Sequence, residues 1–221
     1  MRILALVTAK SYSTRVANKS RKLIMGKPLY KWTIDFLVRN KRWFDAIAFS
    51  SDAPELFTLI PEKILKITRP KSLCEDNIPH VLSVKHGLLQ SEHHYGIDFD
   101  YVILFQPTNP FRTETDLMMM INFIEKYTPM IGKTYYVDDN IQPGYILGAT
   151  FDNEINEKGI VIRSGSMYCY ARKYLMGGHM HDDYGSVYVT VPKRRGYNIN
   201  NEEDFTIVES FMKEYKCELK Q

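Results

Sequence analysis

Ile3-Leu4-Ala5-Leu6-Val7-Thr8-Ala9-Lys10-Ser11-Tyr12-Ser13-Thr14-Arg15 decides the fold, because an apolar run is followed directly by a polar, cationic loop. Five apolar residues predict a buried first strand. The loop carries Lys10, Arg15 and Lys19 just past the end of that strand. Open α/β sheets bind ligands at the carboxyl ends of their strands, and hydroxyls, backbone N–H groups and cations together favour a polyphosphate. The alternative is a solvated basic loop.

Composition places the chain among ordinary globular proteins. A length of 221 residues indicates one large domain, or a domain with a small appendage. The net charge of +3, with 25% charged residues, argues against nucleic acid or an anionic membrane as the main partner. Three widely separated cysteines (Cys74, Cys169 and Cys217) lack metal-site spacing. Residues 1–8 are too short for a signal-peptide core and no apolar run reaches the ~18 residues of a membrane span, so we expect a soluble, cytoplasmic protein with reduced thiols.

Strands and helices are predicted to alternate after the first loop. Further strands are expected over 44–49, 64–67 and 101–105, and helices over 27–39, 53–59, 78–89 and 113–127. Thr113 is the expected N-cap of the last of these helices. Such alternation is typical of a mostly parallel sheet with right-handed crossovers.

The pattern changes beyond residue 128. Extended segments are expected over 131–137, 145–150, 159–162, 167–171 and 186–191, with polar turns over 138–140 and 151–158 and a closing amphipathic helix over 201–216. These strands predict either an antiparallel addition to the sheet edge or a small lobe over the ligand crevice. We therefore expect one domain over 1–221, with 128–171 as a possible substrate-binding or dimerisation lobe.

A series of short motifs carries a family resemblance. In chain order they are Ala-Lys-x-x-Ser-x-Arg-x-x-x-Lys at 9–19, Gly-Lys-Pro-Leu at 26–29, Ser-Ser-Asp at 50–52, Arg-Pro at 69–70, Gln-Pro-Thr-Asn-Pro-Phe-Arg-Thr at 106–113 and Asn-Asn-Glu-Glu-Asp-Phe at 200–205. This order resembles the CMP-sialic acid synthetases, cytidylyltransferases that activate nonulosonic and related 2-keto-3-deoxy sugar acids. The octet at 106–113 is the most specific motif. The resemblance implies an α/β, Rossmann-like three-layer nucleotide-diphospho-sugar transferase fold, with an antiparallel extension in the C-terminal half, and a homodimer.

The same resemblance implies a reaction and its phosphate-binding residues. The anomeric hydroxyl of an acidic 2-keto sugar attacks the α-phosphorus of CTP and pyrophosphate leaves, usually with Mg²⁺. Lys10 stands where the family has an arginine, and Lys19 matches the second loop cation; both are implied to be catalytic. Ser13, Arg15 and Ser20 are implied to bind substrate. For the two lysines the alternative is a solvent-facing charge.

Four further residues are assigned to substrates by the resemblance. Arg69 and His80 are implied to lie beside the nucleotide, whereas Gln106 and Arg163 are implied to bind the sugar acid, with Arg163 also counted as catalytic. A guanidinium can hold a carboxylate through two parallel hydrogen bonds. The alternatives are a surface charge for Arg69 and a structural role for His80.

Two other polar residues are left with open alternatives. Asp52 could belong to the site or cap the next helix. Arg112 is interpreted as a structural ion-pair partner or as a residue of a helix N-terminus.

One departure from the family concerns the metal. The family binds Mg²⁺ with an aspartate pair, and this chain has Asn198 and Asn200 at those positions. An amide oxygen can ligate Mg²⁺ but adds no negative charge, so affinity should fall. The main hypothesis is an active cytidylyltransferase for an atypical sugar acid. A non-catalytic nucleotide-binding relative remains open, as does, less favoured, a nucleotide-sugar glycosyltransferase using Asp138-Asp139 or Asp182-Asp183.

Overall fold

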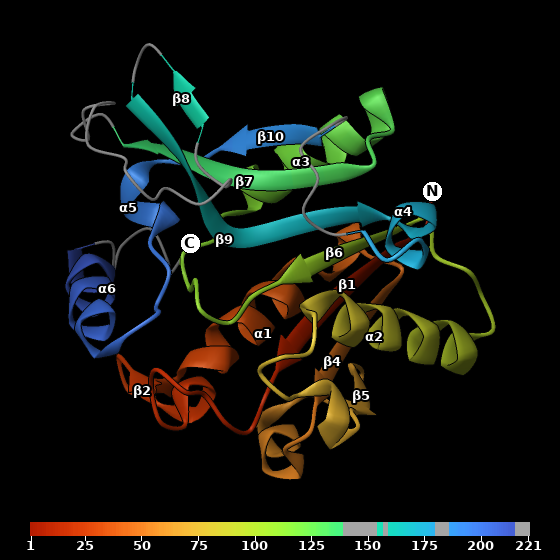
Figure 1. Cartoon of the computed structure of the whole chain (residues 1–221), viewed down its shortest axis with the longest axis horizontal. Helices are drawn as coiled ribbons and strands as arrows, with labels where there is room; N and C mark the ends of the chain where they lie inside the picture. The colour runs from red at the N-terminus through yellow and green to blue at the C-terminus, as the bar shows by residue number, and fades with distance from the viewer. Residues whose placement is uncertain (139–153, 157–158, 180–185, 215–221) are drawn as a thin grey trace.

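An eight-stranded sheet forms the centre of the protein, with helices on both of its faces (Figure 1). The computed structural model describes residues 1–138, 154–156, 159–179 and 186–214. Along the sheet the strand order is β10-β7-β9-β6-β1-β4-β5, and β8 pairs with β9. The predicted three-layer α/β architecture is confirmed.

The parallel half of the sheet contains four strands joined by helices. Its strands are β1 (Ile3–Ala9), β4 (Ala46–Ser51), β5 (Leu65–Thr68) and β6 (Tyr101–Phe105). The helices α1 (Leu29–Arg39) and α2 (His80–Tyr95) belong to this half, and α3 (Glu114–Tyr127) follows β6. β1 pairs in parallel with β4 on one side and with β6 on the other.

The other half of the sheet contains the expected antiparallel extension. Its strands are β7 (Ile131–Asp138), β8 (Glu154–Asn156), β9 (Gly159–Ala171) and β10 (Ser186–Thr190). β9 runs antiparallel to both β6 and β7, whereas β10 is parallel to β7. The short helices α4 (Arg172–Met176) and α5 (Lys193–Gly196) precede the terminal helix α6 (Glu202–Glu214).

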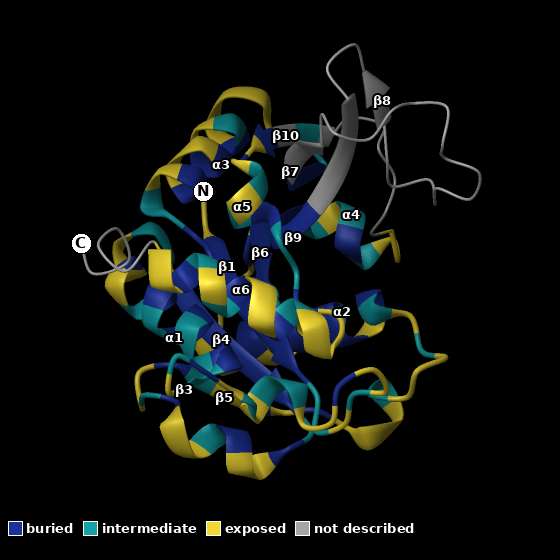
Figure 2. Ribbon diagram, turned by 90° about the vertical axis from the view of Figure 1, so that its left-hand side faces the viewer, coloured by how far each residue is buried: buried dark blue, intermediate teal, exposed yellow. Residues whose placement is uncertain are grey.

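Burial explains why β1 decides the fold. Alternate β1 residues face two different hydrophobic clusters: Ile3, Ala5 and Val7 pack against α1 and α3, whereas Leu4 and Leu6 pack on the side of α2. β1, β4 and β6 are buried throughout (Figure 2). A strand that is covered on both faces is read in sequence as a continuous apolar run.

Several predicted boundaries are wrong for identifiable reasons. The helix expected over 27–39 begins at Leu29, because Lys27–Pro28 pairs with Leu23–Ile24 as a two-stranded ribbon. The short helix expected over 53–59 is present as a 3₁₀ helix over Pro54–Leu59. Part of the expected 151–158 turn is β8, because residues 154–156 pair with β9.

Other expected segments are joined together or fall beyond the described residues. The strands expected over 159–162 and 167–171 are parts of one strand, β9. The strand expected over 145–150 lies outside the described residues, as do Cys217, Asp139 and the pair Asp182-Asp183. Cys74 and Cys169 are free thiols. The described strands of 128–171 belong to the main sheet, and a substrate or dimer role for this segment stays a prediction.

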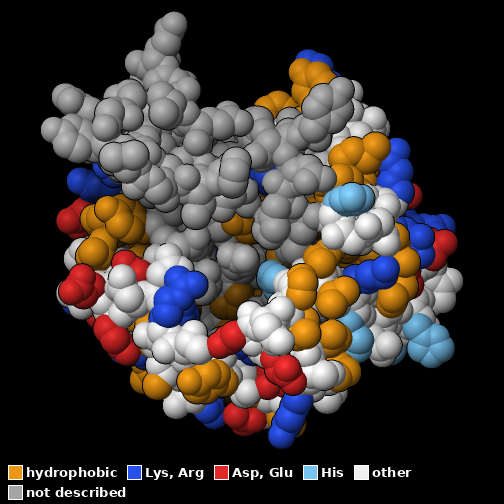
Figure 3. Space-filling view, in the orientation of Figure 1, with side chains coloured by type: hydrophobic (Ala, Val, Ile, Leu, Met, Phe, Trp, Pro, Cys, Tyr) orange, Lys and Arg blue, Asp and Glu red, His pale blue; other side chains and the backbone are white. Residues whose placement is uncertain are grey.

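Among the helices of the described ranges, none is both long enough and apolar enough to pass through a lipid bilayer. Basic and acidic side chains are interspersed on the face shown in Figure 3, in keeping with the nearly balanced charge.

The path of the chain around β1 creates a place for a ligand. β1 leads into α1 on one face of the sheet, whereas α2 on the opposite face leads into β6. From the adjacent carboxyl ends of β1 and β6 the chain continues in opposite directions along the sheet, from β1 toward β4 and from β6 toward β7. In open α/β sheets this reversal of strand order is where ligands bind.

Candidate functional site

A cleft of about 340 Å³ lies at the carboxyl ends of β1 and β6. It is lined by residues from four separate parts of the chain, and these include the predicted site residues Lys10, Arg15, Lys19, Arg69, His80, Gln106 and Asn200. Ser13, Ser20 and Asn198 are not among its lining residues. Most of the residues proposed to bind a nucleotide are thus brought to one place by the fold.

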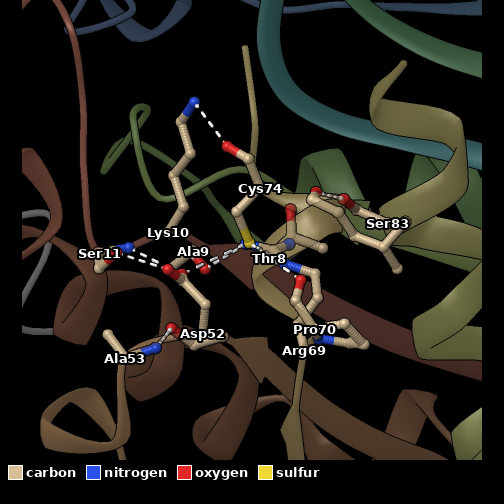
Figure 4. Close-up of polar contacts among 12 residues, drawn as sticks. Thr8, Ala9, Lys10, Ser11, Asp52, Ala53, Arg69, Pro70, Cys74 and Ser83 are labelled. Atoms are coloured by element: carbon tan, nitrogen blue, oxygen red, sulfur yellow. Dashed lines mark hydrogen bonds and ion pairs between the residues drawn. The ribbon is translucent and has the colours of Figure 1, made fainter. Parts of the chain in front are cut away.

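Arg69 is buried beneath this cleft rather than exposed on the surface (Figure 4). Its Nη2 donates to the carbonyl oxygen of Ala9 at 2.6 Å, and its Nε donates to Cys74 Sγ at 3.0 Å. Asp52 lies 4.0 Å from the same guanidinium. The alternative of a surface charge for Arg69 is therefore wrong, because its charge is used to hold the end of β1 against the 70–74 turn.

Asp52 anchors the start of the cationic loop. Its carboxylate accepts hydrogen bonds from the backbone N–H of Ser11 at 2.8 Å and from the Ser11 hydroxyl (Figure 4). Burial alone would raise the pKa of Asp52, but the hydrogen bonds from Ser11 outweigh it and leave that pKa below its ordinary value. The 3₁₀ helix that follows has Ala53 as its N-cap residue, so Asp52 does not cap it.

Lys10 extends across the mouth of the cleft. Its ammonium group donates to the carbonyl oxygen of Cys74 at 3.4 Å and forms an ion pair with Asp76. Both side chains are substantially exposed, at 35% for Lys10 and 54% for Asp76. Ion pairs this open to solvent contribute little free energy. Lys10 can therefore exchange Asp76 for an anionic ligand at small cost.

Lys19 and Arg15 connect the first loop to the C-terminal segment. Lys19 Nζ donates to the backbone oxygens of Ile199 at 3.0 Å and Asn200 at 3.2 Å. Arg15 Nη1 donates to Asn200 Oδ1 at 3.4 Å. Burial lowers the pKa of Lys19, the nearby Arg15 charge lowers it further, and Asp204 opposes both. Two cationic side chains of the first loop, those of Arg15 and Lys19, thus lie beside Asn200, which is distant in sequence, and line the cleft with it.

His80 and Gln106 lie in different parts of the chain and both line the cleft. His80 is the first residue of α2, and its Nε2 lies 3.0 Å from Thr8 Oγ1. Gln106 follows β6 directly and lines the cleft with its neighbours Pro107 and Thr108. An amide that can both donate and accept suits a ligand rich in hydroxyls.

Arg112 holds the backbone of Gln106 in place through a hydrogen bond. This side chain is buried, and it donates to Thr33 Oγ1 at 2.8 Å, to Ser166 O at 2.9 Å and to Gln106 O. Within the described part of the chain the acceptors of Arg112 are neutral carbonyl and hydroxyl oxygens, and the expected ion pair is not found there. Arg112 precedes the N-cap Thr113 of α3, whose capping box with Asp116 confirms the predicted start of that helix.

Asn109 is a connecting residue that the sequence motifs do not mark as structural. Its buried Nδ2 donates to Ser164 O at 3.2 Å and to Arg195 O at 2.9 Å, and its Oδ1 accepts from the N–H of Phe111 at 2.9 Å. One amide therefore joins the 106–113 octet to β9 and α5. Its presence in the most specific motif was the only signal that the sequence offered.

The roles of all the predicted site residues stay predictions, and three of these residues are located only by the part of the chain in which they lie. The backbone of Arg163 lies in β9 opposite Tyr135 of β7, and its side chain is outside what the structure describes. Ser20 lies in the 3₁₀ turn Lys19–Arg21, and Ser13 lies in the loop before it. Both serines are half-buried.

The asparagine pair does not fit a resident Mg²⁺ site. Asn198 Oδ1 accepts from Thr108 Oγ1 at 3.3 Å, Asn200 Oδ1 accepts from Arg15, and the Lys19 ammonium lies against the same segment. Mg²⁺ in proteins is usually held by one or two carboxylates together with phosphate oxygens. Within the described residues, no group of three or more His, Cys, Asp or Glu side chains could hold a metal ion.

Comparison with known protein families identifies the family to which this sequence belongs. The sequence model of a family described as cytidylyltransferase matches residues 4–144. The chain belongs to the cytidylyltransferase family. The matched region of this cytidylyltransferase runs from β1 into β7 and beyond, and it includes Lys10, Lys19, Arg69 and Gln106.

Individual relatives narrow the comparison. An N-acylneuraminate cytidylyltransferase of Escherichia coli O18:K1:H7 is 27% identical over 138 residues, which cover 60% of this chain and 31% of that protein. A CMP-N,N'-diacetyllegionaminic acid synthase of Legionella pneumophila is 31% identical over 114 residues, 51% of this chain and 48% of that protein. The match thus spans less than half the length of either relative.

A solved structure supports the fold over nearly the whole chain. A CMP:2-keto-3-deoxy-manno-octonic acid synthetase complexed with CTP superposes with a TM-score of 0.71 at 12% identity, covering 97% of this chain and 99% of that one. At such low identity the likeness shows the fold alone.

Proposed function

We propose that this protein is an active cytidylyltransferase that transfers CMP from CTP to an acidic 2-keto-3-deoxy sugar. The observation that carries the proposal is the convergence of Lys10, Arg15 and Lys19 in one cleft at the carboxyl ends of β1 and β6. Polyphosphate transfer depends chiefly on positioning and on neutralising charge, which these cations supply. Family membership and the names of the relatives support the same reaction class.

The reaction forms a bond between the anomeric oxygen of the sugar and the α-phosphorus of CTP. The bond from that phosphorus to the bridging oxygen of pyrophosphate breaks, pyrophosphate leaves, and the hydroxyl proton passes to solvent. Lys19, held by two backbone carbonyls, is fixed in place as a phosphate ligand. Lys10 leaves Asp76 to contact the phosphates. Cytidylyltransferases are generally metal-dependent, but the neutral, hydrogen-bonded amide oxygens of Asn198 and Asn200 do not fit a resident Mg²⁺.

We propose that the sugar acid binds at the carboxyl end of β6, beside Gln106. Gln106 would hydrogen-bond its hydroxyl groups, with the Gln106 backbone held by Arg112. Arg163 would pair with the sugar carboxylate. Arg69 and Asp52 act through the loop, because they fix Ala9 and Ser11 at the start of the phosphate site.

A second candidate follows from the asparagine pair. Without carboxylates at Asn198 and Asn200, the chain could bind a nucleotide and lack transfer activity. The two candidates share the nucleotide site and differ only in turnover. A homodimer that uses residues 128–171 also remains a prediction, which light scattering would test.

The deciding experiment is pyrophosphate release from CTP with a panel of 2-keto-3-deoxy sugar acids. The proposed enzyme releases pyrophosphate only when a suitable sugar acid is present, and Lys19→Ala abolishes that release. CTP binding without release for any sugar acid would support the non-catalytic candidate. Absence of CTP binding would contradict both.

A further inference from the structure

The cationic side chains of Arg15 and Lys19 lie beside the segment 198–200, next to the cleft. Lys19 Nζ lies 3.0 Å from Ile199 O and 3.2 Å from Asn200 O. Arg15 Nη1 lies 3.4 Å from Asn200 Oδ1. The side-chain oxygens of both asparagines already accept hydrogen bonds. Asn200 Oδ1 accepts from Arg15, and Asn198 Oδ1 accepts from Thr108. Two cationic groups thus adjoin the same short segment.

The carboxylates of Asp204 and Asp76 already have other hydrogen-bond or ion-pair partners. Asp204 accepts from the backbone N–H groups of Asn200 at 2.6 Å and Asn201 at 2.9 Å, so it serves the start of α6. Asp76 is paired with Lys10. The lining residues of the cleft include four cationic side chains (Lys10, Arg15, Lys19 and Arg69) against two carboxylates, those of Glu75 and Asp76. The described lining of the cleft therefore carries an excess of positive charge, even when Asp52 is counted against Arg69.

We propose that Lys19 and Arg15 take the place of a protein-held divalent cation, so that the cleft binds the polyphosphate of CTP without Mg²⁺. This inference rests on the proposed function, because it concerns the same nucleotide site. Ammonium and guanidinium groups both form charge-assisted hydrogen bonds with phosphate oxygens. Among the described residues Lys19 donates to backbone carbonyls and forms no ion pair, although Asp204 acts on its charge from farther away, so its ammonium group can attract an anion.

The test is calorimetric measurement of CTP affinity with Mg²⁺ and with EDTA. The wild-type dissociation constants in the two conditions should agree to within about threefold. Asn200→Asp places a carboxylate beside the phosphates and should weaken binding about tenfold in EDTA, with Mg²⁺ restoring it. Asn200 is an exposed residue, so this variant should fold as the wild type does.

A matched variant controls for the added charge. Asn122→Asp makes the same change on an exposed position of α3, away from the cleft, and should leave both affinities unchanged. Wild-type binding that requires Mg²⁺ would overturn the inference and leave the proposed function standing. Equal affinities for wild type and Asn200→Asp in EDTA would also overturn it. Absence of CTP binding in every condition would overturn both proposals.

Discussion

The side-chain amide of Asn198 occupies the space that a side chain at Gly165 would fill. A Cβ atom at residue 165 would lie 2.1 Å from Asn198 Nδ2. Gly165 also has a φ of +63°, which L-residues rarely adopt. Because Asn198 Oδ1 accepts from Thr108, the strand β9, the 106–113 octet and the 198–200 segment meet at this point. The absence of a side chain at residue 165 therefore leaves the room in which the Asn198 side chain packs.

Gly165→Ala should destabilise the protein by more than the cost of backbone strain alone. A positive φ costs an L-residue about 1–2 kcal/mol, and the contact with Asn198 adds to it. Gly26→Ala is the matched control, because Gly26 has a φ of +76° and a Cβ atom there would meet nothing within 4 Å. Urea unfolding of both variants measures the difference. Equal losses of stability would mean that the Asn198 contact relaxes without cost.

Nucleotide preference tests the base-binding part of the cleft. CTP or CDP should raise the melting temperature more than ATP, GTP or UTP, because a ligand that binds only the folded state stabilises it according to its affinity. Thermal unfolding at matched nucleotide concentrations gives the comparison. Equal shifts for all nucleotides would argue against a cytidine-specific pocket.

Separate subsites predict separate losses of binding. Lys19→Ala should weaken CTP binding and leave sugar-acid binding intact, because Lys19 lines the part of the cleft that is proposed to bind the phosphates. Gln106→Ala and Arg163→Ala should do the reverse. Titration calorimetry with each ligand measures both. If every variant loses both ligands equally, the division into two subsites is incorrect.

Asp76→Asn should increase the affinity for CTP. The substitution removes the anion that competes for Lys10, and an exposed pair is worth about 0.2–1 kcal/mol, so a gain of up to about fivefold is expected. Glu202→Gln is the control, since Glu202 pairs with Lys22 and neither residue lines the cleft. A loss of affinity in Asp76→Asn would show that Asp76 assists nucleotide binding instead.

Asp52 should make stability depend on pH in the acidic range. Its pKa is lowered in the folded protein, so the ionised carboxylate adds stability at pH values above its ordinary pKa. That contribution is lost as the pH falls through the ordinary value toward the lowered one. The stability difference between wild type and Asp52→Asn should therefore shrink below about pH 4. Denaturant unfolding from pH 7 to pH 3 measures it, and a constant difference would contradict the prediction.

The sequence by itself determined the elements of the parallel half and the order of the motifs. The run Ile3–Val7 and the run Tyr101–Phe105 predict strands that are covered on both faces, because a doubly buried strand needs apolar residues at every position. Thr113 and Asp116 encode the start of α3 through a capping box. Each of these signals lies within a few neighbouring residues, so it can be recognised without knowledge of the rest of the chain.

Only the tertiary structure decided which distant groups meet and which become buried. Lys19 contacts residues 199 and 200, Arg69 lies under Ala9, and Asn109 joins Ser164 to Arg195. These partners are set by the crossovers that bring the ends of β1 and β6 beside β9 and the segment before α6. Periodicity reports the face that a residue presents, but its hydrogen-bond partner depends on how the whole chain folds back. For this reason the cationic loop was predictable, whereas the burial of Arg69 and the packing of Asn198 on Gly165 were not.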